Sequence, residues 1–244
     1  MISHGKWCAS GSQNRTDRQT DVHSSTSIST ILMGRRLLLL QTGTVAVLAA
    51  LATGAAAALA AESGDPTVPI QQFSATLVTV MKAGRTTTFT QRFAMLKPAV
   101  NEAFDLNALI RGAVGLDWIN LPPDQQSALF SAFQRYTVSN YTANFNSCDG
   151  QSLNVLPETR ALPNGEVVVR TQIIRPGQSR VELDYIMRQT TAGWKAVDVL
   201  SDGAISQVAV QRSDFRRLLL NGGVAALRAG LERKITDLSG GTLA

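Results

Sequence analysis

The spacing of hydrophobic residues changes twice along this chain. From residue 65 to 145, apolar side chains recur every three or four positions, the spacing that places them on one side of an α-helix. From residue 153 to 200 they alternate with polar residues, as in strands with one buried face. The helical spacing returns from residue 205. Helices, then strands, then helices predict an α+β fold.

Four helices are predicted before residue 146. The apolar spacing places them at about residues 65–84, 88–104, 106–114 and 122–145. Pro98 lies inside the second helix and predicts a kink or a break, because proline removes a backbone donor and clashes with the preceding turn. Asp105 is placed to cap the third helix. The fourth helix is the longest and begins at Pro122-Pro123-Asp124.

The alternating region predicts a four-stranded antiparallel sheet packed against these helices. Asn164-Gly165 is typical of a β-hairpin, and further turn residues separate the other strands. The strands are expected at about residues 153–160, 167–175, 181–190 and 194–200. The last strand leads through the turn Ser201-Asp202-Gly203 into two C-terminal helices. We expect these at about residues 205–220 and 224–238, separated by Asn221-Gly222-Gly223.

The first 60 residues differ in composition from the rest. Residues 1–32 are polar without an apolar period, which predicts disorder or a stretch upstream of a true start at Met33. Residues 33–60 have a basic start, an apolar middle and a small-residue end, so they are expected to be a Sec-type signal peptide. The alternative is an uncleaved membrane anchor, because the apolar run is long enough to span a bilayer. The folded domain is expected at residues 61–244.

Charge and histidine content narrow the function classes. The net charge is +5, but residues 1–60 hold five Lys or Arg and two Asp, which leaves 18 basic and 16 acidic side chains in the remainder. This balance argues against nucleic-acid binding. Both histidines, His4 and His23, precede the predicted domain. The domain therefore lacks the parts of a Ser-His-Asp site or a His-ligated zinc site, and Cys148 is a poor candidate nucleophile.

Asp198 is the main candidate for acid–base chemistry. A strand-borne aspartate that faces an apolar pocket can act as a general base, as in small α+β cone isomerases, which gives an enzyme acting on a hydrophobic substrate as the alternative function. A local hydrogen-bonding role for Asp198 is favoured, because no second acid–base group has a recognisable position. The sequence holds no glycine-rich phosphate loop, and no cofactor is predicted.

The apolar content is more informative than the charged residues. Aromatic residues recur on the longest helix, and one sheet face is strongly apolar. The residues concerned are Phe130, Phe133, Tyr136, Tyr141, Phe145, Val167, Val169, Ile173, Leu183, Tyr185 and Met187. Such faces form either a filled core or a cavity for an apolar ligand, and the sequence leaves both open. Arg212, Arg216 and Arg217 form a basic segment that suits anionic headgroups, a partner protein or simple solvation.

Short motifs follow one another in a specific order between residues 104 and 223. They are Phe104-Asp105 with Gly115 and Trp118, Pro122-x-Asp124-Gln125-Gln126, Val169-Arg170-Thr171 with Ile174-Arg175-Pro176-Gly177, Val181-x-Leu183-x-Tyr185, Gly193-Trp194-Lys195-x-Val197-Asp198-Val199, Gly203-x-x-Ser206, Arg212-Ser213-x-Phe215 and Gly222-Gly223. With these motifs, residues 66–238 resemble the MlaC family of periplasmic phospholipid-shuttle proteins, also called toluene-tolerance auxiliary proteins. Residues 202–215 are most similar to its hopanoid-associated, HpnM-like branch.

The resemblance implies a monomeric periplasmic lipid carrier without a cofactor, a metal or enzymatic activity. Its NTF2-like or MlaC-like fold would hold phospholipid or hopanoid tails in an apolar cavity between sheet and helices. Its expected partners are a membrane-anchored MCE-type component of an inner-membrane ABC transporter and an outer-membrane lipoprotein or porin complex. Independently of the resemblance, the basic segment Arg212, Arg216 and Arg217 is the candidate surface for binding a partner. The expected lipid-binding residues are Phe104, Leu109, Trp118, Phe133, Tyr136, Tyr141, Val167, Val169, Ile173, Val181, Leu183, Tyr185, Met187, Val197 and Val199.

Overall fold

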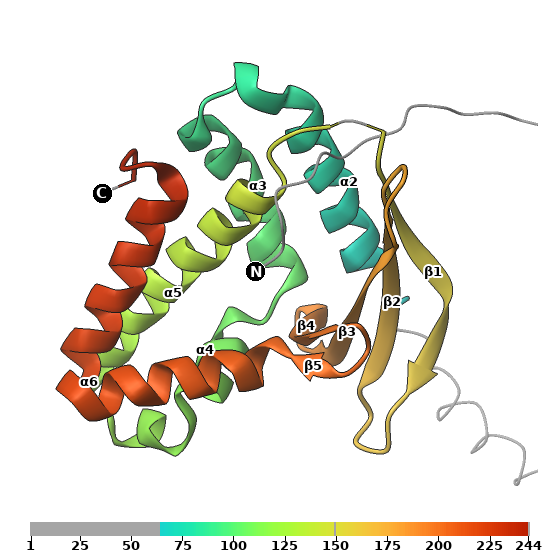
Figure 1. Cartoon of the computed structure of the whole chain (residues 1–244). Coiled ribbons are helices and arrows are strands. Elements are labelled where there is room, and N and C mark those ends of the chain that lie inside the picture. Colours follow the sequence, from blue (N-terminus) through green and yellow to red (C-terminus); the bar gives the residue numbers. More distant parts are fainter. Residues whose placement is uncertain (1–63, 149, 244) are drawn as a thin grey trace, which may run out of the picture. The chain divides into compact units, whose positions relative to one another are not determined.

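The computed structural model describes residues 64–148 and 150–243 (Figure 1). The predicted signal peptide and the residues before it lie outside this part of the chain. The described helices are α2 (Val68–Ala83), η1 (Gly84–Thr86), α3 (Phe89–Ala103), α4 (Leu106–Val114), η2 (Gly115–Asn120), α5 (Pro123–Asn144) and α6 (Gln207–Ser239), where η denotes a 3₁₀-helix. The strands are β1 (Ser152–Ala161), β2 (Val167–Ile174), β3 (Val181–Thr190), β4 (Gly193–Ser201) and β5 (Ile205–Ser206). The α+β prediction is confirmed.

The sheet is an antiparallel meander in the order β1-β2-β3-β4-β5. The four predicted strands are present, and the two-residue β5 adds a fifth, pairing with the end of β4. Val169 on β2 lies opposite Tyr185 on β3, which in turn lies opposite Val199 on β4. These three residues share one face, and the helices α2 to α6 lie to this side of the sheet (Figure 1).

Helix starts follow the expected capping chemistry. Thr88 begins α3 with a capping box, in which its hydroxyl accepts from the Gln91 amide and the Gln91 side chain accepts from the Thr88 amide. Asp105 caps α4 by accepting from the Ala108 amide at 2.9 Å, as predicted. Pro98 lies inside a continuous α3, so the predicted break at this proline is wrong. Because Pro98 and the residue one turn before it, Ala94, are both exposed, water can bond the carbonyl that the proline leaves free.

The two predicted C-terminal helices are the two halves of α6. The backbone leaves helical geometry at Gly222 and Gly223, and Gly223 has a φ of 63°, a conformation that glycine adopts without strain. In Figure 1, the first half of α6 runs away from β5 and the second half turns up alongside α5. Phe133 of α5 packs edge-on against Phe215 of α6, with ring centroids 6.3 Å apart.

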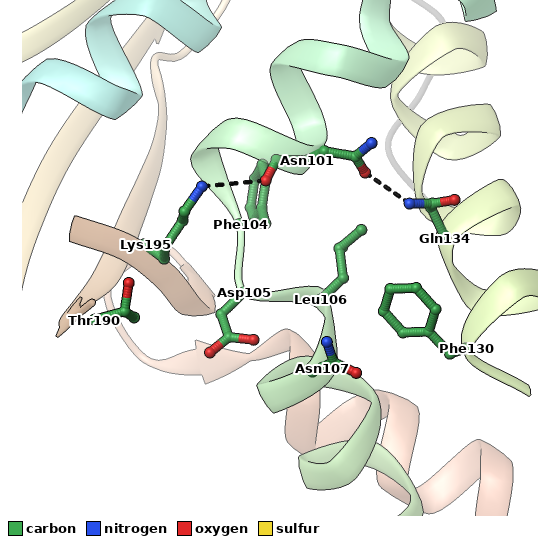
Figure 2. Close-up of a pocket in the computed structure, with 9 residues that line it drawn as sticks. All are labelled: Asn101, Phe104, Asp105, Leu106, Asn107, Phe130, Gln134, Thr190 and Lys195. Atoms are coloured by element: carbon green, nitrogen blue, oxygen red, sulfur yellow. Dashed lines mark hydrogen bonds between the residues drawn. The ribbon is translucent and has the colours of Figure 1, made fainter. Parts of the chain in front are cut away.

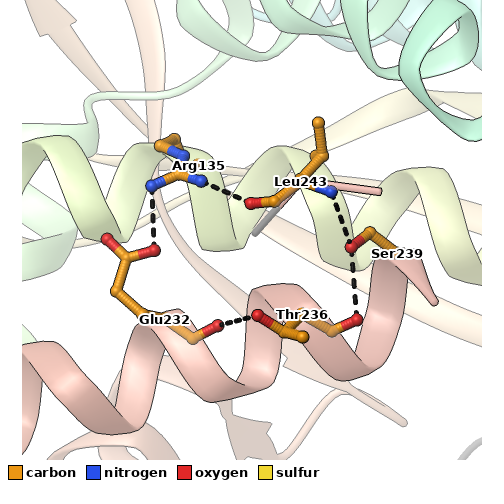
Figure 3. Close-up of polar contacts among 5 residues, drawn as sticks. All are labelled: Arg135, Glu232, Thr236, Ser239 and Leu243. Atoms are coloured by element: carbon orange, nitrogen blue, oxygen red, sulfur yellow. Dashed lines mark hydrogen bonds and ion pairs between the residues drawn. The ribbon is translucent and has the colours of Figure 1, made fainter. Parts of the chain in front are cut away.

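A polar cluster holds the C-terminal end of the chain against α5 (Figure 3). The Arg135 guanidinium of α5 binds the Glu232 carboxylate of α6 at 2.8 Å and donates to the Leu243 carbonyl at 2.7 Å. The Leu243 amide donates to the Ser239 hydroxyl at 3.2 Å. These contacts fix the second half of α6 on the helical layer.

The segment between α3 and α4 connects the helices to the sheet. Phe104 pairs with Ala196 in an isolated parallel bridge, and the Asp105 amide donates to the Ala196 carbonyl at 2.9 Å. This bridge occupies part of the edge of β4 that β5 leaves free. It also brings the C-terminal end of α3, the start of α4 and the sheet together at one place.

Candidate functional site

An aromatic cluster fills the space between α2, α5 and β3. Phe73 lies edge-on to Phe104 and to Tyr141, with centroid distances of 5.2 and 4.9 Å. Phe104 also lies 6.1 Å from Tyr185, and Tyr141 lies 5.9 Å from Phe145. Edge-on and tilted contacts of this kind stabilise aromatic pairs beyond the effect of burial. The cluster therefore forms a continuous apolar region that joins the helices to the sheet.

Two tyrosine hydroxyls lie in this cluster. Those of Tyr141 on α5 and Tyr185 on β3 are close enough to interact electrostatically across the helix–sheet boundary. Burial raises the pKa of both phenols above the ordinary value of 10, and for Tyr141 the neighbouring Tyr185 adds to the rise. Both hydroxyls are therefore neutral at any physiological pH. These two side chains therefore add no charge to the apolar region.

Most residues expected to bind lipid lie in one hydrophobic cluster. Those buried in it are Phe104, Leu109, Trp118, Phe133, Val169, Ile173, Tyr185, Met187 and Val199. Four others are half-buried and packed against it, namely Tyr136, Tyr141, Val181 and Leu183. Within the cluster, Phe133 packs on Phe215, and the Lys234 ammonium lies 5.5 Å from the Tyr136 ring. Phe133 and Tyr136 therefore belong to the contact between α5 and α6.

Two of the expected residues lie elsewhere. Val197 belongs to a separate small cluster with Val168 and Ile186, so its placement with Val199 is wrong. The cause is a register shift in β4, where Ile186 pairs with Asp198 and Met187 pairs with Ala196. The extra residue makes Val197 face away from the main cluster. Val167 is half-buried at the start of β2 and belongs to neither cluster.

A surface pocket of about 300 Å³ opens beside the aromatic cluster (Figure 2). Its walls come from the end of α3, the start of α4, the middle of α5 and the β3–β4 turn. The lining residues are Asn101, Phe104, Asp105, Leu106, Asn107, Phe130, Gln134, Thr190 and Lys195. Phe104 is 3% exposed and belongs to both the pocket and the aromatic cluster. Phe104, together with Leu106, which is 4% exposed and also belongs to the main cluster, therefore separates the pocket from the apolar interior.

Most polar groups at the rim of the pocket already have partners. The Lys195 ammonium donates to the carbonyl of Glu102 at 2.6 Å and to that of Asn101 at 3.3 Å, and it lies 3.3 Å from the Glu102 carboxylate. The Gln134 amide donates to the Asn101 side chain at 2.8 Å. The apolar walls are thus the part of the pocket that can still gain from a ligand. Sequence reasoning missed the pocket, because its residues are scattered from 101 to 195.

Asp198 is committed to local hydrogen bonds. Its carboxylate accepts from the Val199 amide at 2.7 Å, from the Val208 amide at 3.1 Å and from the Ser206 hydroxyl. The Ser206 hydroxyl in turn accepts from the Ala209 amide at 3.0 Å and caps α6. Asp198 therefore ties β4 to the N-terminal end of α6, which favours the structural role over that of a base.

The three arginines singled out from the sequence lie along the first half of α6. Arg212 donates from Nε to the Gly112 carbonyl at 2.7 Å, near the C-terminal end of α4. Arg216 and Arg217 are exposed. In the described residues, no group of three or more His, Cys, Asp or Glu side chains is arranged to hold a metal ion. None of the helices in that part of the chain is long and apolar enough to cross a membrane.

Comparison with known proteins identifies the family. The family model described as MlaC protein matches residues 71–233. The solved structure of the phospholipid-binding protein from Ralstonia solanacearum, in complex with a phospholipid, has the same fold. It aligns with a TM-score of 0.62 and 22% sequence identity over 72% of this chain and 99% of that chain. No curated protein matches the sequence significantly.

The chain belongs to the MlaC family. MlaC proteins are periplasmic, and membership agrees with the expectation that this chain is not an enzyme. The low identity to the Ralstonia protein means that this likeness shows the fold and not the ligand.

Proposed function

We propose that this protein is a periplasmic carrier that holds the tails of a lipid between its helices and its sheet. The observation that carries the proposal is the continuous apolar region from the pocket wall at Phe104 to the sheet residues Val169, Tyr185 and Val199. The Ralstonia protein, which shares the fold, was determined with a bound phospholipid. That likeness supports the proposal without identifying this chain's ligand.

Hydrophobic transfer alone can supply the affinity that a carrier needs. Each buried CH₂ group contributes about 0.8 kcal/mol, so a sixteen-carbon tail contributes roughly 12 kcal/mol before the costs of ordering it. No catalytic group or metal is needed for this. An apolar interior is needed, and the buried cluster around the uncharged Tyr141 and Tyr185 provides one.

Loading requires the interior to open. The pocket of about 300 Å³ is at the lower end of the size range of ligand sites, and aromatic side chains occupy the space behind it. We infer that a tail enters where Phe104 forms the inner wall and displaces this ring from its contacts with Phe73 and Tyr141. The helical layer would then shift over the sheet to accept the rest of the tail.

The remaining parts of the proposal concern cargo and route. Membership of the MlaC family favours a phospholipid as cargo, and the similarity of residues 202–215 to the hopanoid-associated branch favours a hopanoid-type lipid as the alternative. Residues 33–60 would direct export, and the carrier would exchange lipid with an MCE-type component of an ABC transporter and with an outer-membrane complex. These partners follow from the MlaC family alone.

Native mass spectrometry of the exported protein, purified without detergent, tests the proposal. We expect the protein to carry lipid and Leu183→Trp to lose most of it, because Leu183 packs against the apolar cluster and the larger ring fills space that a tail needs. Ile174→Trp is the matched control, since Ile174 on β2 is 43% exposed. The proposal fails if the unmodified protein carries no lipid, or if both variants carry as much as it does.

A further inference from the structure

Two aliphatic side chains project from η2 into solvent. Leu116 is 86% exposed and Ile119 is 77% exposed, more than the other exposed large hydrophobic residues of the described chain. Leu220, at the bend of α6, follows at 76%. Solvent-exposed aliphatic tips of this kind lower stability in water slightly and contribute nothing to the core. Leu116 and Ile119 lie only three positions apart on η2, so together they offer an apolar contact to a partner that is itself apolar.

The turn that carries these tips is rigid. Trp118, which lies between them in sequence, is only 6% exposed and is buried in the main cluster. The Gln126 side-chain amide donates to the carbonyl of Trp118 at 3.1 Å and to that of Leu121 at 3.0 Å. The Leu121 backbone amide also donates to the Trp118 carbonyl, at 3.2 Å. Leu116 and Ile119 are therefore held outward by an anchored turn.

Arginine residues lie beside this turn and along the adjoining helices α4 and α6. The first residue of η2, Gly115, lies next to Arg212, since a Cβ placed on Gly115 would be 4.0 Å from its Nε atom. Arg216 follows Arg212 by one helical turn on the same side of α6. Arg111, in the last turn of α4, is exposed. Against these cations, η2 itself contains one acidic residue, Asp117, which is exposed.

We propose that η2 and the first half of α6 form a docking surface for an anionic lipid bilayer. Leu116 and Ile119 would insert among the acyl chains, while Arg111, Arg212 and Arg216 would contact headgroup phosphates. Exposed aliphatic side chains with arginines on the adjoining helices match the layering of a bilayer interface, which is apolar inside and anionic at its surface. A protein partner fits less well, because a protein interface needs a broad, packed apolar centre and not isolated tips.

This surface is separate from the lipid-carrying interior. The docking proposal therefore goes beyond the proposed function and is tested independently of it. A carrier that docks on a bilayer would reach its cargo directly, whereas one that lacks docking depends on membrane proteins for every exchange.

Vesicle sedimentation tests the docking. The exported protein, in the form that a Gram-negative host produces, is mixed with phosphatidylcholine vesicles with or without phosphatidylglycerol. We expect binding to the anionic vesicles that weakens with salt.

The double variant Leu116→Asp with Ile119→Asp should lose about tenfold or more in affinity. Arg216→Glu should lose about fivefold or more, and only on anionic vesicles. Arg233→Glu, in the second half of α6 and exposed, is the charge-matched control and should bind normally.

A local readout excludes binding through another part of the chain. The tryptophan fluorescence of the Leu116→Trp variant should be quenched, relative to the unmodified protein, by lipids brominated in their acyl chains. The Val210→Trp variant should show no such additional quenching, because Val210 is at an exposed position of α6 that points away from the Arg212 side. The proposal is overturned if the protein stays in solution with both vesicle types, which would point to a protein partner. Normal binding by the aspartate variant, or equal quenching at residues 116 and 210, also overturns it. Lipid content by native mass spectrometry should be the same in the variants of Leu116, Ile119 and Val210, which lie outside the lipid-binding interior and the candidate partner-binding arginines.

Discussion

Phe104 shows how a single residue can belong to two environments. It forms the inner wall of the surface pocket, and its ring contacts Phe73, Tyr141 and Tyr185 in the interior. Its backbone is fixed by the bridge to Ala196, so the ring is the part that can move. This combination suits a side chain that closes the lipid-binding space when it is empty.

Removing the ring tests this role. Phe104→Ala should lower the free energy of unfolding by about 3–5 kcal/mol, as expected for loss of a buried aromatic side chain. It should also increase the rate of lipid exchange with vesicles, measured with a fluorescent lipid, because the pocket then opens into the interior. Phe130→Ala is the control, since Phe130 lines the pocket without belonging to the aromatic cluster. Equal exchange rates in the two variants would contradict the role of Phe104.

Asp184 is a buried carboxyl on β3. It precedes Tyr185, so its side chain lies on the face of the sheet opposite to that ring. It is 6% exposed, and burial raises its pKa above 3.8. Arg170 and Arg160 act against this rise, and Glu182 adds to it. The folded protein therefore binds the Asp184 proton more tightly than the unfolded chain does. As a result, this residue makes stability fall as the pH rises from about 3.8 through the folded pKa, and the loss persists at higher pH.

Asp184→Asn should therefore stabilise the protein more at pH 7 than at pH 3, because the variant has no charge to bury. Urea unfolding at the two pH values measures the difference. Asp237→Asn, which removes an exposed carboxylate from the last turns of α6, controls for the change in net charge. A variant that gains as much at pH 3 as at pH 7 would show that the carboxylate of Asp184 is not disfavoured by burial.

At the level of elements, the joint between β4 and α6 organises the C-terminal part of the fold. Asp202 has a φ of 52° and Gly203 a φ of 68°, which lets the chain turn sharply after β4. Asp198 and Ser206 then bond the first amides of α6. Charge-assisted bonds of this kind stabilise a helix start, where backbone donors have no partners in the helix.

Asp198→Asn distinguishes this joint from a catalytic site. The variant keeps the shape of the side chain but loses its charge, so it should lower the free energy of unfolding by about 1–3 kcal/mol and leave lipid content unchanged. Chemical denaturation and lipid extraction measure the two effects. Asp214→Asn is the control, since the Asp214 side chain is 47% exposed in its pair with Lys234. An Asp198→Asn protein of normal stability would contradict the structural role.

The elements themselves were largely predictable because their signals are local. The capping residues Thr88 and Asp105 and the glycine pair at 222–223 each mark a helix boundary or bend within a few positions. The shift at Val197 was not predictable, because an extra residue in β4 depends on its pairing with β3. Pro98 carried the expected signal, but α3 continues through it without a break, because its exposure lets water bond the freed carbonyl.

At the level of the whole molecule, the apolar residues of the candidate site could be predicted, but their partners could not. Periodicity identified Val169, Tyr185 and Tyr141 as facing inward, and all three contribute to one apolar region. Periodicity did not separate residues that face the sheet from Phe133 and Tyr136, which face α6. The pocket was invisible for a related reason, since it forms only when α3, α4, α5 and the β3–β4 turn come together.

Photo-crosslinking is the most direct test of the central claim that lipid tails lie between the helices and the sheet. The exported protein would be loaded with a phospholipid that carries a diazirine near the end of one tail, irradiated, and mapped by peptide mass spectrometry. We predict adducts on inward-facing positions, above all Val169, Tyr185 and Phe104. Adducts confined to the opposite sheet face, at Val168, Ile186 and Val197, or an absence of adducts despite bound lipid, would contradict the account.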